Sequence, residues 1–150
     1  MGQEMRWLQA HIRQCLQDVW GVCRVEFDAD GDVPFRTGIA AGWICAVDGE
    51  PRLVRVWAHA ATGVKPTAAV LRELNDMSRR SPAAHVFWAD GGVIVEQTLH
   101  ADGVDTATLG HAWRQVSGVA NHLGPMLTAV HGGSTPFPVA DTAVDDREAG

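Results

Sequence analysis

The stretch from Lys65 to Asp102 decides the fold, and it reads KPTAAVLRELNDMSRRSP followed by AAHVFWADGGVIVEQTLHAD. Thr67 can cap the first turn of a helix, apolar residues then recur at helical spacing, and Ser81-Pro82 end the pattern. The residues that follow favour strands and turn at Asp90-Gly91-Gly92, which is typical of a tight β-hairpin. The stretch therefore predicts one helix followed by one hairpin in a mixed α+β domain.

The rest of the chain predicts two further helices and three further strands. An amphipathic helix is expected over 7–20, strands over 22–28, 35–47 and 52–60, and a last helix after Asp105 that Gly124-Pro125 kinks or ends. The order α-β-β-β-α-β-β-α has hairpin connections, so we expect a five-stranded antiparallel sheet with the helices packed mainly on one side. Residues 1–130 are expected to form a single domain, and 131–150 a mobile acidic tail.

Composition excludes several classes of function. A net charge of −6 disfavours binding to nucleic acid or to an anionic membrane surface. No apolar run is long enough to span a bilayer and no signal core opens the chain, so a cytoplasmic protein is expected. Cys15, Cys23 and Cys45 lack metal-binding spacing and are interpreted as reduced structural thiols, and the DADGD sequence at 28–32 as a plain turn rather than a calcium loop. No cofactor is expected.

One face of the predicted strand 35–47 carries small apolar residues where polar ones would be usual. Gly38, Ala40 and Gly42 lie on this face together with the larger Ile44. Two interpretations remain open: close packing of a helix or subunit, or a groove for a partner segment. We name these four residues as a partner or dimer surface, together with Trp57, which is expected to lie near Trp43 across the next strand pair.

Catalytic motifs are missing from the sequence. An acid–base group could form only if scattered residues converged on the sheet, namely His59, His85, His100, Glu96 and Asp90. Histidines on a strand surface are the favoured interpretation. Asn75 lies at the apolar edge of the helix, where a structural hydrogen bond to backbone at the start of the hairpin is favoured over contact with a partner.

LRELNDMSRRSPAAHVFWADGGVIVEQTL resembles the helix–hairpin signature of the YbjN-like family, within the type III secretion chaperone-like superfamily. Leu71, Leu74 and Asn75 fit the family pattern Leu-x-x-Leu-Asn-x-x-Asn, whereas Ser78 replaces its second Asn. DGDVPFRTG resembles the first hairpin of the family, and VANHLGPML its closing helix, with Asn121 in place of the commoner Asp. The resemblance covers residues 5–130.

The resemblance implies an α-β3-α-β2-α fold, frequent homodimers and no catalytic residues. We therefore expect a non-enzymatic chaperone-like adaptor that binds a peptide or protein segment, acting as a homodimer. One alternative is a regulatory or structural homodimer without a peptide client. Another is an enzyme or small-molecule-binding domain, which would need a deep pocket where His85, Glu96 and His100 converge.

Overall fold

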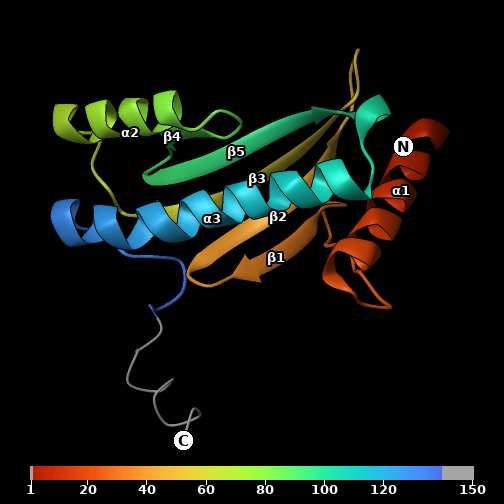
Figure 1. Cartoon of the computed structure of the whole chain (residues 1–150), viewed down its shortest axis with the longest axis horizontal. Helices are drawn as coiled ribbons and strands as arrows, with labels where there is room; N and C mark the ends of the chain where they lie inside the picture. Colours follow the sequence, from red (N-terminus) through yellow and green to blue (C-terminus); the bar gives the residue numbers. More distant parts are fainter. Residues whose placement is uncertain (1, 140–150) are drawn as a thin grey trace, which may run out of the picture.

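The computed structural model describes residues 2–139 and confirms the predicted fold class and element order. The elements are α1 (Gln3–Trp20), β1 (Val33–Thr37), β2 (Ala40–Val47), β3 (Leu53–Thr62), α2 (Ala68–Arg80), β4 (His85–Ala89), β5 (Gly92–His100), the short 3-10 helix η1 (Ala101–Gly103) and α3 (Thr106–His131). The strands form one antiparallel sheet in the order β1-β2-β3-β5-β4 (Figure 1).

The predicted helix ends and hairpin turn are confirmed by their local geometry. The Thr67 side chain accepts a hydrogen bond from the Val70 N–H at 3.2 Å, which caps α2. Asp105 and Thr108 form a reciprocal capping box that begins α3. Asp90 has a φ of 51°, as the tight turn between β4 and β5 requires.

Two of the predicted strands are wrong. Residues 22–28 are not a strand, although Val25 is buried and the Arg13 guanidinium lies over the Phe27 ring at 4.9 Å, so this segment packs on α1 without pairing. The predicted strand 35–47 is instead the hairpin of β1 and β2. It turns at Gly38, whose φ of 55° favours glycine and whose missing side chain makes room for Asn121 of α3.

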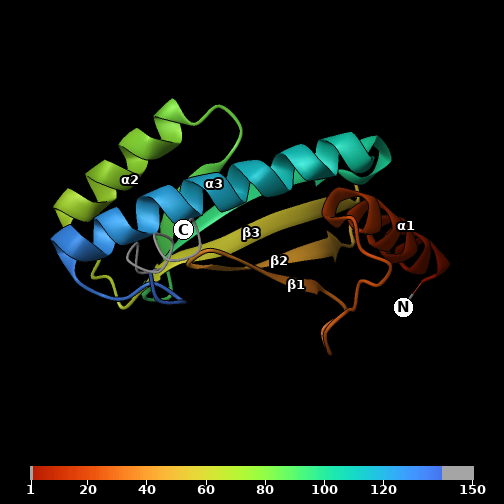
Figure 2. The ribbon, with the colours of Figure 1, turned by 60° about the horizontal axis from the view of Figure 1, so that its bottom comes forward.

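The helices gather on one face of the sheet. Figure 2 shows α3 lying along this face, with α1 at one end of it and α2 beside it. The core between these layers consists of apolar residues from α1, α3 and the strands: Leu8, Ile12, Leu16, Ile44, Val54, Val56, Leu109, Val116, Leu123 and Leu127. None of the helices within residues 2–139 is long and apolar enough to cross a membrane.

Gly124 lets α3 approach the sheet closely. A Cβ atom on this residue would overlap the backbone carbonyl of Ala60 in β3. Gly124-Pro125 was predicted to kink or end the helix, and an end is wrong: α3 continues to His131, with Leu127 still buried. Tertiary packing therefore overrides the usual effect of proline inside a helix.

The segment after α3 returns to the sheet. Ser134 pairs with Thr62 through two backbone hydrogen bonds of 2.8 and 2.9 Å, and the Phe137 N–H donates to the Ile39 carbonyl. The boundary at residue 131 between domain and mobile tail is therefore wrong, since residues 132–139 are held by the domain. The acidic part of the predicted tail, at 140–150, lies outside the described residues.

Candidate functional site: the open face of the sheet

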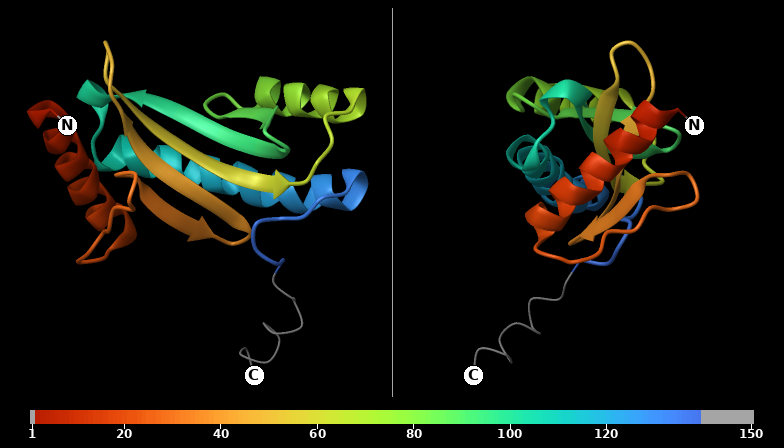
Figure 3. Two further views of the ribbon diagram at one scale, coloured as in Figure 1. Left: turned by 180° about the vertical axis from the view of Figure 1, so that it is seen from behind. Right: turned by 90° about the vertical axis from the view of Figure 1, so that its right-hand side faces the viewer.

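The second face of the sheet has no helix over it among residues 2–139. The left view of Figure 3 shows this face with α3 behind the strands. The strand register places two rows of side chains on it, one with Trp43, Trp57, Glu96 and His85, and one with Ala41, His59, Ile94 and Phe87. We call these eight residues the open face.

Aromatic rings dominate the centre of the open face. Trp43 and Trp57 stack with their ring centroids 4.7 Å apart and an angle of 26° between the rings. The His59 ring meets both of them edge-on, at 5.3 Å from Trp57 and 5.9 Å from Trp43. All three side chains remain partly exposed, so the cluster presents apolar surface that could still be buried by a partner.

An internal ion pair borders the aromatic cluster. The Arg55 guanidinium contacts both carboxylate oxygens of Glu96, with Nε–Oε1 at 2.8 Å and Nη2–Oε2 at 2.9 Å. The same guanidinium lies 4.8 Å from the centroid of the Trp57 ring. Because Arg55 and Glu96 neutralise each other, the face carries little net charge at its centre.

The titratable groups near the cluster are also held neutral. Burial lowers the pKa of His59, so its ring is uncharged at neutral pH. Burial raises the pKa of the Cys45 thiol to about 11. A thiol of this kind is a weak nucleophile at neutral pH, so the face is suited to binding rather than to catalysis.

The histidine and carboxylate group considered from the sequence is spread over the sheet. Glu96 lies opposite His85, but its carboxylate is held by Arg55, and His100 lies opposite Leu53 at the far end of β5. Asp90 lies in the β4–β5 turn. Residues 2–139 contain no group of three or more His, Cys, Asp or Glu side chains that could hold a metal ion.

Most of the small-residue face predicted as a partner surface faces the core. Ala40 and Ile44 are 0% and 1% exposed, which fits the close packing of a helix, and the Phe35 ring of β1 occupies the space beside Gly42. Gly38 lies against Asn121 in α3. Trp57 alone of the five lies on the open face. The error has a geometric cause. The turn at Gly38 changes which alternate residues face the core, so treating 35–47 as one strand placed Ala40, Gly42 and Ile44 on the uncovered side of the sheet.

The prediction for Asn75 is also wrong. Asn75 is exposed on α2, and the backbone at the start of the hairpin is hydrogen-bonded by Ser78 instead. The Ser78 hydroxyl accepts from the Val86 N–H at 2.7 Å and donates to the Val86 carbonyl at 2.8 Å. One side chain thus satisfies both backbone groups of Val86 in β4, an edge strand. Asn121 has a similar role in α3, where its Oδ1 accepts from the Ile39 N–H at 2.9 Å.

Comparison with protein families identifies the chain. The model of the family TY-Chap1, described as "T3SS (YopN, CesT) and YbjN peptide-binding chaperone 1", matches residues 6–139. This chain belongs to that family. The family consists of peptide-binding chaperones rather than enzymes, which confirms the non-enzymatic interpretation and the family predicted from the helix–hairpin sequence.

Solved structures of the same fold include two complexes and one further relative. A chain of the ExsC–ExsE complex is 11% identical with a TM-score of 0.65, over 85% of this chain and 97% of that one. A chain of the HopA1–SchA chaperone–effector complex is 8% identical with a TM-score of 0.67, over 83% and 98%. YbjN from E. coli is 19% identical with a TM-score of 0.56, over 77% and 90%. A search of curated proteins finds no match.

Phe87 and Ile94 were missed as members of the open face. Strands β4 and β5 are apolar on both sides in this region, so residue alternation in the sequence does not tell the covered side from the open one. The pairing of Trp43 with Trp57 was the signal available, because two tryptophans on opposed strands must share a face.

Proposed function

We propose that this member of the TY-Chap1 family is a chaperone-like adaptor that acts as a homodimer in the cytoplasm and holds a segment of another protein on its open face. The observation that carries the proposal is the stacked cluster of Trp43, Trp57 and His59 on a sheet face that no helix of residues 2–139 covers. The family description and the chaperone–effector complex of the same fold support a protein segment as the ligand.

The chemistry of the face suits an extended apolar segment. Stacked indole rings bury large apolar area without demanding a particular sequence, and the neutral His59 and the Arg55–Glu96 pair add no net charge. Cys15, Cys23 and Cys45 are all free thiols, which supports a reducing compartment.

The test is binding of a fluorescently labelled, permanently unfolded protein, such as reduced and carboxymethylated α-lactalbumin, together with sedimentation to measure mass. The double variant Trp43→Ser/Trp57→Ser is expected to weaken binding about tenfold or more while the fold is retained. Val130→Ser is the matched control, because Val130 is 69% exposed but lies at the end of α3, away from the open face.

Three outcomes would count against the proposal. Equal binding by the double variant and the control would remove the open face as the binding surface. A monomer at every concentration would remove the dimer. A dimer that binds no unfolded protein, and that the double variant converts to monomer, would favour the regulatory or structural homodimer in which the open face is consumed by self-association.

A further inference from the structure

An unpaired arginine lies at the β1 margin of the open face. The strands contain two arginines and no lysine. Arg55 is held by Glu96, whereas Arg36 takes part in no ion pair among residues 2–139. The strand register pairs Arg36 with Ala41, so Arg36 extends the second row of the open face onto β1. This margin therefore carries a positive charge that no carboxylate of the described residues neutralises.

An aromatic ring holds the Arg36 side chain in place. Its guanidinium carbon lies 3.8 Å from the centroid of the Phe137 ring. Phe137 belongs to the segment that returns to the sheet after α3, and its N–H donates to the Ile39 carbonyl at 3.0 Å. The Thr135 hydroxyl donates to the Phe137 carbonyl at 2.6 Å. Stacking uses one face of the guanidinium and leaves its N–H groups, which lie in the plane, available to a carboxylate.

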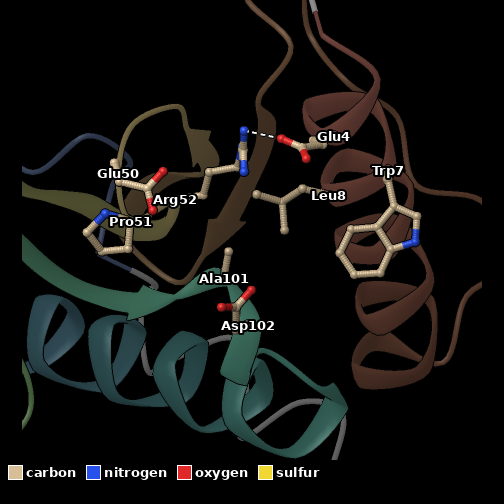
Figure 4. Close-up of a pocket in the computed structure, with 8 residues that line it drawn as sticks. All are labelled: Glu4, Trp7, Leu8, Glu50, Pro51, Arg52, Ala101 and Asp102. Atoms are coloured by element: carbon tan, nitrogen blue, oxygen red, sulfur yellow. Dashed lines mark ion pairs between the residues drawn. The ribbon is translucent and has the colours of Figure 1, made fainter.

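The arginine just before β3 has no such freedom. Arg52 lines a cavity of about 270 Å³ between α1 and the β2–β3 turn, and there it contacts the carboxylate of Glu4 (Figure 4). A second carboxylate, that of Asp48, lies 3.4 Å from its Nε. The single arginine of this cavity is thus already neutralised, which leaves Arg36 as the arginine of the sheet region that can pair with a ligand.

The row that Arg36 extends is otherwise uncharged. From β2 to β4 it continues with Ala41, His59, Ile94 and Phe87. Neighbouring strands lie about 4.8 Å apart, so His59 on β3 is about 10 Å from Arg36 along the row. An extended chain advances about 3.3 Å per residue, so a segment that follows the row spans this distance in about three residues.

The two features of the row select the chemistry of the segment. A guanidinium with free N–H groups binds a carboxylate, and the aromatic cluster binds a large apolar side chain. We propose that Arg36 makes the open face selective for an extended protein segment that carries an acidic residue about three positions from an aromatic or large aliphatic one. The carboxylate pairs with Arg36, and the apolar side chain packs on Trp57 and His59. The inference rests on the proposed function, because it names which segments the open face prefers.

The first test is the selection of dodecapeptides from a random phage-displayed library on the full chain. We expect enrichment of Asp or Glu about three positions from Phe, Trp, Leu or Ile. Arg36→Gln should lose the enrichment of acidic residues and keep that of apolar ones. Arg114→Gln is the matched control: it removes the same charge from an exposed position on α3, which lies on the covered side of the sheet, and should select as the wild type does.

The second test measures the affinity of one selected peptide by fluorescence anisotropy. Replacing its acidic residue by the corresponding amide should weaken binding to the wild type about threefold, as for an exposed ion pair, and leave binding to Arg36→Gln unchanged. Arg36→Glu should instead prefer the same peptide with lysine at that position. Phe137→Leu should weaken the acidic peptide about twofold and leave the amide peptide unchanged, because the guanidinium is no longer held by an aromatic ring.

The outcomes separate this inference from the proposed function. Selected peptides without acidic residues, acidic residues at no fixed spacing, or an acidic preference that survives Arg36→Gln would overturn the inference. An equal loss from Arg114→Gln would also overturn it, since overall charge would then attract the peptides. The proposed function survives these results as long as Trp43→Ser/Trp57→Ser abolishes the selection. If the double variant selects the same peptides as the wild type, or if no peptide is enriched, both fail.

Discussion

The two faces of the central strands β2 and β3 differ in side-chain size, and the larger side chains lie on the face that no helix of residues 2–139 covers. On these strands the covered face carries small and β-branched residues such as Ala40, Ile44 and Val56, which are almost fully buried because α3 lies on them. The open face of the same two strands carries Trp43 and Trp57. A helix of the same chain can approach the strands closely only where their side chains are small. A face that a partner covers can instead carry large aromatic side chains.

Ile44 and Trp43 are neighbours on β2, and substituting each of them tests the difference between the two faces. Ile44→Ala is expected to lower the free energy of unfolding by about 3 kcal/mol, because it leaves a cavity beneath the helices. Trp43→Ala removes a larger side chain but should cost only about 1 kcal/mol, since much of its surface is already in contact with solvent or with Trp57. Urea denaturation measures both. A larger loss from Trp43→Ala would mean that the aromatic cluster is structural.

The close approach of α3 to the covered face can be tested with two glycines of the same helix. Gly124→Ala should destabilise the protein by about 2 kcal/mol, because its Cβ would overlap the Ala60 carbonyl. Gly118→Ala is the matched control: nothing lies within 4 Å of its added Cβ, so the better helix propensity of alanine should stabilise by about 1 kcal/mol. The same sign for both variants in thermal unfolding would contradict the packing argument.

Ser78 of α2 contacts the edge strand β4, whereas Asn75 of the same helix is exposed to solvent. Ser78→Ala leaves the Val86 N–H and carbonyl without their partner and should cost about 1.5 kcal/mol. Asn75→Ala, on the exposed side of α2, should change stability by less than about 0.5 kcal/mol. Amide hydrogen exchange at Val86 gives an independent measurement, and protection there that survives Ser78→Ala would mean that another group satisfies the edge.

The smallest expected effect is a pH dependence from the open face. The folded-state pKa of His59 is lowered by burial, so the unfolded chain binds its proton at higher pH than the folded one does. The stability that His59 contributes is therefore fully present above its unfolded pKa of about 6.5 and is lost as the pH falls from there toward the lower folded pKa. His59→Gln should flatten the stability profile between about pH 7 and pH 5. An unchanged profile would show that His59 is not the group responsible.

Local signals in the sequence were sufficient for α2, the β4–β5 hairpin and the start of α3. The Thr67 cap, the Asp90-Gly91-Gly92 turn and the Asp105 cap act through bonds between residues close in the chain, so their effect can be deduced from the sequence alone. The family could also be deduced from the sequence alone, because its resemblance was carried by the residues of α2 and of the β4–β5 hairpin.

The candidate site could be deduced only in part. The opposition of Trp43 and Trp57 follows from hairpin pairing, but the side of the sheet that α3 covers does not. The backbone at the start of the β4–β5 hairpin is hydrogen-bonded by Ser78, whereas the helical pattern suggested Asn75. The two residues lie less than one helical turn apart, so a small rotation of α2 decides between them.

The sequence by itself determined the α+β class, the caps of α2 and α3, the β4–β5 hairpin and the family, because these depend on short-range hydrogen bonding and on residue periodicity. The tertiary structure decided the split of residues 33–47 at Gly38, the continuation of α3 past Pro125 and the identity of the open face. These three features depend on contacts between residues far apart in the chain, such as Asn121 with Ile39 and Gly124 with Ala60. The energy of such contacts exceeds local propensity only once the helices and the sheet have packed together.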